Sequence, residues 1–157
     1  MNLNHLTLKT QEAVQAAQQY AFEKGHPQIE NEHLFYGLLE VDDTVLPFIF
    51  NKLQVQLPLL KQLNESALKR FSKVEGGAQV LSQKASQTLM NAIALAKKQQ
   101  DEYVATEHLL QALFESNGTL SKMLSDQGIT KKKLQDAIQE LRKGEKVTSA
   151  SAEENYN

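Results

Sequence analysis

Apolar residues recur along most of the chain at spacings of three and four, the period of a helix with one buried face. Short polar breaks divide this pattern into eight predicted helices, and the same order of helix signals occurs twice. Residues suited to helix starts mark the first three helices of each half: Thr7 and Ser82, Asn31 and Thr106, and Thr44 and Thr119. The fourth helices are predicted from apolar stripes within residues 60–68 and 134–141, the second with Thr130 as its N-cap.

The doubled pattern is also a sequence repeat. A shift of 75 residues aligns Leu6–Glu40 with Leu81–Glu115, and 9 of the 35 aligned pairs are identical. The triplet Glu-His-Leu occurs at 32–34 and again at 107–109, and a shift of 74 continues the match beyond Asn117. The sequence therefore predicts an all-α fold of two pseudo-symmetric four-helix repeats, at residues 6–71 and 81–143. Because each repeat is too small to bury its apolar stripes well alone, we expect one compact domain over residues 1–144.

Residues 145–157 break the helical pattern. They follow Lys143-Gly144, are mostly polar and offer almost nothing to bury. This composition predicts a linker or a disordered tail. Because a linker normally leads to another domain, we expect more chain to follow in the intact protein.

Composition supports the helical prediction and narrows the function. Five good helix formers, Ala, Leu, Gln, Glu and Lys, supply 84 of the 157 residues, against only 7 Gly and 3 Pro. The absence of cysteine excludes disulfides, thiolate metal sites and cysteine nucleophiles. A net charge of −2 gives no basic footprint for nucleic acid or for an anionic membrane. The N-terminus lacks the basic and apolar regions of a signal peptide, which predicts a cytoplasmic protein.

Catalytic signatures are missing from the sequence. It contains no phosphate-binding glycine loop and no nucleophile elbow, and each Glu-His pair offers one histidine where a zinc helix needs two. We interpret His33 and His108 as packing residues whose rings bond a neighbouring turn, with a shared metal site as the alternative. We expect His5 and His26 to be exposed. A small hydrolase or metal enzyme is a further alternative, which tight zinc binding would support.

An acidic loop is the most promising candidate site. Asp101, Glu102 and Tyr103 shortly precede Glu107, which lies in the first turn of a predicted helix. An apolar groove flanked by these carboxylates would suit extended peptides with basic or apolar side chains. The alternative is an ordinary polar loop, with Glu107 serving only the helix dipole.

Three stretches together resemble the Clp N-terminal repeat family. They are Ile29-Glu30-x-Glu32-His33-Leu34, then residues 103–110 with Glu107-His108-Leu109-Leu110, then the exit Leu141-Arg142-Lys143-Gly144 with the residues up to Tyr156. The exit and the opening residues 1–7 are more similar to the disaggregase branch of this family. Asn31 and Asn155 depart from its usual pattern.

The resemblance implies the substrate-binding N-terminal domain of a protein disaggregase. Such a protein is a homohexameric AAA+ chaperone that works with the Hsp70 system and threads unfolded or aggregated polypeptide. ATP and Mg would belong to its ATPase modules, the first reached through residues 145–157, so this chain should hold no cofactor and hydrolyse no ATP. We expect the isolated domain to be monomeric. The alternative is an adaptor-docking N-domain of a ClpA- or ClpC-like unfoldase that works with a peptidase.

The resemblance also suggests binding residues. The polar positions linked to substrate in the family match Thr7, Asp101 and Glu107, and the adjacent apolar groove matches Leu89 and Leu95. We add Tyr103 from the acidic loop. On this interpretation, removing the Asp101 or Glu107 carboxylate weakens binding and leaves the domain folded.

Overall fold

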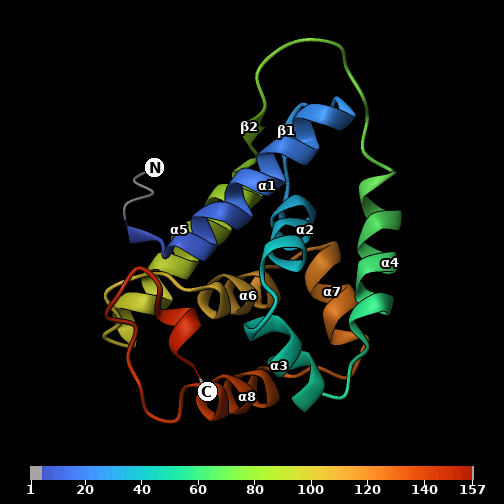
Figure 1. Ribbon diagram of the computed structural model, residues 1–157. Helices are drawn as coiled ribbons and strands as arrows, with labels where there is room; N and C mark the ends of the chain where they lie inside the picture. Colours follow the sequence, from blue (N-terminus) through green and yellow to red (C-terminus); the bar gives the residue numbers. More distant parts are fainter. Residues whose placement is uncertain (1–4, 157) are drawn as a thin grey trace.

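The computed structural model describes residues 5–156, and the opening tetrapeptide that contributed to the resemblance lies outside this range. Within it the chain forms eight α-helices, as predicted (Figure 1). They are α1 (Leu8–Lys24), α2 (Asn31–Val41), α3 (Val45–Lys52), α4 (Leu57–Leu68), α5 (Gln83–Lys98), α6 (Thr106–Glu115), α7 (Thr119–Ser125) and α8 (Lys131–Arg142). The all-α prediction is therefore confirmed. None of these helices is long and apolar enough to cross a membrane.

The helix caps follow the predicted residues closely. Thr7, Ser82 and Thr130 each accept a hydrogen bond from the backbone N–H three residues on, at 3.0–3.2 Å. Thr119 instead forms the first residue of α7, with Gly118 as the N-cap. Cap signals lie within one turn of the helix they start, which explains why sequence alone locates them.

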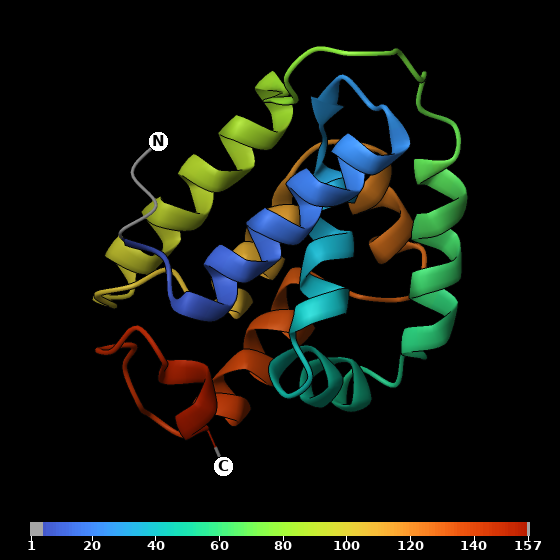
Figure 2. The same cartoon turned by 45° about the horizontal axis from the view of Figure 1, so that its top comes forward.

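Two short strand pairings tie the repeats together reciprocally. Strand β1 (Gln28–Ile29) pairs in parallel with β2 (Val80–Leu81), and Leu6 forms a parallel bridge with Val104. In the repeat alignment Leu6 matches Leu81 and Ile29 matches Val104, so the two pairings are equivalent and each joins one repeat to the other. The helices α1 and α5 accordingly lie side by side and run in opposite directions (Figures 1 and 2).

Small residues bring α1 and α2 close together. The buried stripe of α1 contains Ala13, Ala17 and Ala21. Gly37 of α2 packs so tightly that a Cβ there would lie 2.0 Å from the backbone oxygen of Ala13. The small side chains of α1 and the missing Cβ on α2 together let the two backbones approach closely.

The C-terminal segment, residues 145–156, differs from the prediction. Val147 is fully buried and Ala152, in the short 3₁₀ helix η2 (Ala152–Asn155), is 4% exposed. Backbone bonds fasten the segment to the domain, from Leu8 N–H to Ala150 O (2.8 Å) and from Glu102 N–H to Val147 O (2.7 Å). The expectation that these residues offer almost nothing to bury is wrong, because Val147 and Ala152 pack against Ala105 of the domain.

Candidate functional site

A buried ionic cluster lies where α6 meets the end of α8. We call it the Arg142 cluster, and its members are Asp101, Glu107, His108 and Arg142, each no more than 8% exposed. Arg142 donates from Nη1 to Asp101 Oδ2 (2.7 Å) and from Nε to Glu107 Oε2 (2.9 Å). One guanidinium thus joins two carboxylates, from the loop before α6 and from its first turn.

Hydrogen bonds indicate the tautomer of His108 and keep Asp101 ionised. His108 Nδ1 accepts from the Ala105 N–H (2.8 Å), so its Nε2 carries the proton and donates to Asp101 Oδ2 (2.8 Å). Asp101 Oδ1 accepts from the Val147 N–H (2.9 Å). Burial alone would raise the pKa of Asp101, but bonds from His108, Val147 N–H and Arg142 outweigh it and lower the pKa to about 2. Asp101 is therefore a stable internal anion.

The C-terminal segment adds a further carboxyl group. Glu153, 2% exposed, accepts from the Thr7 hydroxyl (2.5 Å) and from the Thr106 N–H (3.0 Å). Burial raises the pKa of Glu153 to about 7, against the hydrogen bond from Thr7 and with the help of the Glu107 charge. Residues 145–156 thus cover the positions at which Thr7, Asp101 and Glu107 come together.

The first repeat fills the equivalent place with histidines. His26 and His33 align with Asp101 and His108, and His26 Nδ1 lies 2.8 Å from His33 Nε2. His33 Nδ1 accepts from the Glu30 N–H (2.9 Å), which bears out its interpretation as a packing residue. His26 is only 2% exposed, so the expectation that it is exposed is wrong, because its ring completes the bond that the buried His33 requires.

The six predicted binding residues do not form an open surface. Thr7 and Glu107 are fully buried, and Asp101 is 8% exposed with its side chain enclosed. Leu89 lies in the core at 1% exposure, while Leu95 is partly buried against the core. Tyr103 is partly buried beside Ala105 and Val147. The structure brings the three polar residues together, but inside the domain, and places Leu89 among the core side chains.

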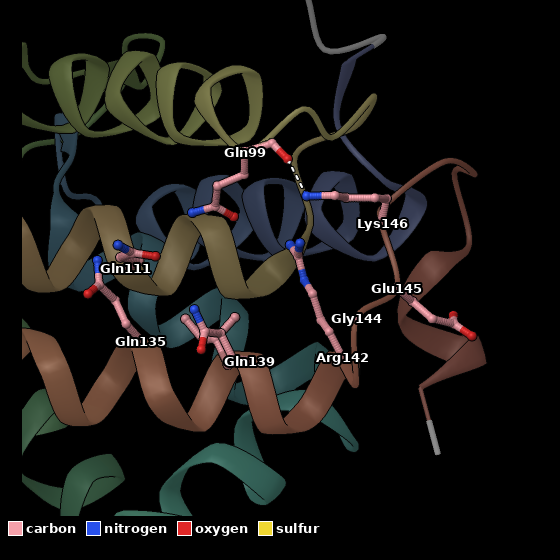
Figure 3. Close-up of a pocket in the computed structure, with 9 residues that line it drawn as sticks. Gln99, Gln111, Gln135, Gln139, Arg142, Gly144, Glu145 and Lys146 are labelled. Atoms are coloured by element: carbon pink, nitrogen blue, oxygen red, sulfur yellow. Dashed lines mark hydrogen bonds between the residues drawn. The ribbon is translucent and has the colours of Figure 1, made fainter.

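An open pocket lies next to the Arg142 cluster. It has a volume of about 530 Å³ and lies between α6, α8 and the end of α5 (Figure 3). We call it the glutamine pocket, because four glutamines line it with Ile138, Arg142, Gly144, Glu145 and Lys146: Gln99, Gln111, Gln135 and Gln139. Gln111 and Gln135 lie next to each other between α6 and α8, and Lys146 Nζ donates to the backbone oxygen of Gln99 (2.9 Å).

Beside its charged side chains, the pocket offers uncharged donors and acceptors from its glutamines. A glutamine amide supplies two N–H donors and an acceptor oxygen, the same groups as a peptide bond. Gln111 Nε2 donates to Glu115 Oε2 (2.9 Å). The side chains of Gln135 and Gln139 form no hydrogen bond with another of residues 5–156. Sequence reasoning missed these residues. The signal was present, since Gln135 and Gln139 are four apart on one helix face.

A metal centre has no support in the described part of the chain. No group of three or more His, Asp or Glu side chains there is arranged to hold a metal ion. In the Arg142 cluster the guanidinium of Arg142 occupies the oxygens that a cation would need.

Comparison with known proteins shows the family to which the chain belongs. The family model of the Clp repeat N-terminal domain matches residues 5–127 and 80–156, so the chain belongs to this family. Chaperone protein ClpB of Bacteroides thetaiotaomicron is 41% identical over 156 residues, which is 99% of this chain and 18% of that protein. The chain thus corresponds to the N-terminal domain of ClpB, and the match does not extend to the ATPase modules.

Solved structures agree on the fold. The Hsp104 N-terminal domain from Candida albicans has a TM-score of 0.85 at 18% identity and covers 96% of this chain and 99% of that one. A ClpV N-domain, solved in complex with a VipB peptide, has a TM-score of 0.73 at 16% identity, with coverage of 88% and 90%. At these identities the likeness shows the fold alone.

Proposed function

We propose that this domain captures extended segments of unfolded or aggregated polypeptide and that the glutamine pocket takes the polypeptide backbone. The observation that carries the proposal is this pocket, on a chain that belongs to a chaperone domain family. Unfolded clients share a backbone and little else, so a general receptor must recognise amides rather than particular side chains. The ClpV N-domain solved with a VipB peptide, which has the same fold, supports the proposal.

The Arg142 cluster supports the pocket from behind. Arg142 forms part of the pocket wall, and Asp101 and Glu107 hold its guanidinium in place. On this proposal Asp101 and Glu107 are positioning residues. Thr7 contributes indirectly, because its hydroxyl donates to Glu153 of the C-terminal segment. Leu95 and Tyr103, both partly buried, remain proposed as apolar contacts, and Leu89 supports them from the core.

The wider role follows the ClpB relatives. The chain spans about 18% of the length of the curated relatives it matches. We therefore propose that it serves as the N-terminal module of a cytoplasmic, homohexameric disaggregase that works with the Hsp70 system, with residues 145–157 leading toward the first ATPase module. Six tethered copies would turn weak pocket contacts into useful avidity.

The test is binding to a model protein kept unfolded by reduction and carboxymethylation, followed by amide NMR titration. The variant Gln135→Ala/Gln139→Ala should bind about fivefold or more weakly, since two hydrogen bonds at about 0.5–1.5 kcal/mol each are lost. Both residues are exposed, so the fold should survive. The matched control is Gln15→Ala/Gln18→Ala, which removes two exposed glutamines from α1. Equal affinities of both variants, or shifts confined to other faces, would refute the proposal.

A further inference from the structure

The repeat symmetry relates the glutamine pocket to a second pocket on the first repeat. We call this the tyrosine pocket; it has a volume of about 300 Å³ and is lined by Tyr20, Tyr36, Leu39, Glu40, Lys61, Asn64 and Glu65. In the alignment, four of these positions match residues that line the glutamine pocket: Tyr36 with Gln111, Lys61 with Gln135, Asn64 with Ile138 and Glu65 with Gln139. Both pockets lie between the second and fourth helices of their repeats, yet their chemistry differs.

Two aromatic rings form one wall of the tyrosine pocket. The ring centroids of Tyr20 and Tyr36 lie 4.3 Å apart. The Nζ of Lys24 lies 5.7 Å from the Tyr20 centroid, so the face of this ring already attracts a cation within the protein. Such faces carry the negative part of the ring quadrupole and favour positively charged groups.

Carboxylates reinforce this preference. Glu40 and Glu65 line the pocket, and Lys61 is the cation among its lining residues. Glu40 takes part in none of the ion pairs found among residues 5–156, while Glu65 contacts the exposed Lys69 at 3.6 Å. Burial raises the pKa of both tyrosines, and neighbouring carboxylates, Glu65 for Tyr20 and Glu40 first for Tyr36, raise it further.

A buried amide also lines the pocket. Asn64 is 2% exposed and donates from Nδ2 to the backbone oxygen of Glu32 (3.0 Å). Its Oδ1 has no hydrogen-bond partner among the described residues. An unpaired buried acceptor costs about 1–3 kcal/mol, and this oxygen is too enclosed for a group in the pocket to reach it. The corresponding residue in the glutamine pocket, Ile138, has no such requirement.

We propose that the tyrosine pocket binds a cationic side chain, lysine or arginine, of the polypeptide that the domain captures. The inference rests on the proposed function, and it adds a substrate class to it. The two aromatic rings and the two carboxylates together match an N–H-rich cation. A volume of about 300 Å³ lies at the small end of ligand sites, which suits one side chain. The two repeats thus divide the work, one holding backbone and the other a positive charge.

The test compares two short unstructured peptides that differ only in lysine against glutamine at two positions. We expect amide shifts at Tyr36 and Glu65 with the lysine peptide, and an affinity about fivefold above that of the glutamine peptide. The variant Glu40→Gln/Glu65→Gln, and separately Tyr36→Leu, should remove most of this difference. Thermal unfolding of each variant checks that the fold is intact.

The matched control is Glu12→Gln/Asp43→Asn, which removes the same charge from two exposed sites elsewhere. If it lowers the preference for lysine as much as the pocket variants do, the effect is net charge and the inference is wrong. Equal affinities of the two peptides also overturn it. If unfolded protein still binds through Gln135 and Gln139 in that case, the proposed function stands; if the lysine peptide binds but unfolded protein does not, only the proposed function fails.

Discussion

Removal of the Asp101 carboxylate should unfold the domain more readily rather than merely weaken binding. The variant Asp101→Ala leaves three buried donors without their acceptor: His108 Nε2–H, Val147 N–H and Arg142 Nη1. Breaking a buried ion pair on one side costs about 3–5 kcal/mol. Because Arg142 keeps its bond to Glu107, we expect about 4 kcal/mol, a large share of the roughly 5–15 kcal/mol that stabilises a typical domain.

Urea unfolding followed by far-UV circular dichroism measures this loss. At an m-value of about 2 kcal/mol per molar, the midpoint should fall by about 2 M. The matched control is Asp136→Ala, whose carboxylate is 60% exposed and pairs with Lys132 at 2.9 Å. Loss of this exposed pair should cost about 0.5 kcal/mol or less.

A double-mutant cycle tests the cause. Asp101→Ala combined with Arg142→Met should cost clearly less than the sum of the single changes, with a coupling of about 1 kcal/mol or more. A loss below about 1 kcal/mol for Asp101→Ala, or strict additivity in the cycle, would refute the account of Asp101 as a buried structural anion. The sequence-based expectation that such variants stay folded and only bind less would then be restored.

Three further predictions follow from other buried groups. Burial and the neighbouring His26 lower the pKa of His33 from 6.5 to about 4. The free energy of unfolding should therefore be full above about pH 6.5 and fall by about 2–3 kcal/mol toward pH 4. An imidazole resonance of His33 that titrates above pH 6 would contradict this. Burial raises the pKa of Glu153 from 4.5 to about 7, so its contribution to stability should be full below pH 4.5 and be lost as the pH rises through 7. Because glutamine stays neutral, Glu153→Gln should slow amide exchange of the C-terminal segment at pH 8. Unchanged or faster exchange would argue against this. Gly37→Ala should lower the free energy of unfolding by about 1–3 kcal/mol or more, because the added Cβ meets the backbone of Ala13. Gly118→Ala should cost far less, because the space around Gly118 is open. Similar losses of thermal stability in the two variants would count against the close packing of α2.

The repeat made much of the fold predictable. Helix order, the caps at Thr7, Ser82 and Thr130, and the packing role of His33 depend on residues within a turn or two of each other. The alignment of the two halves then predicted two four-helix units. It did not reveal that Leu6 and Ile29 pair with the other repeat, because that exchange depends on how the units dock.

The candidate site was harder to predict for a related reason. Asp101 and Glu107 stood out as polar residues near a helix start, but their partner Arg142 lies 41 and 35 residues further along the chain. Without knowledge of that partner, sequence analysis interprets Asp101 and Glu107 as surface carboxylates. The same holds for Glu153, whose bond to Thr7 spans 146 residues and brings the polar tail onto the domain.

The sequence by itself thus determined the helices, the two repeats and the family. The helical period and the cap residues depend on residues close together in the chain, and the repeat is visible by aligning the two halves. The tertiary structure alone decided which polar groups are buried and which remain open to a ligand. Burial of a charge depends on whether a distant partner compensates its lost hydration, and only the packed chain shows where Arg142 lies. The two symmetry-related pockets have the same origin, because each needs two helices that meet only in the folded domain.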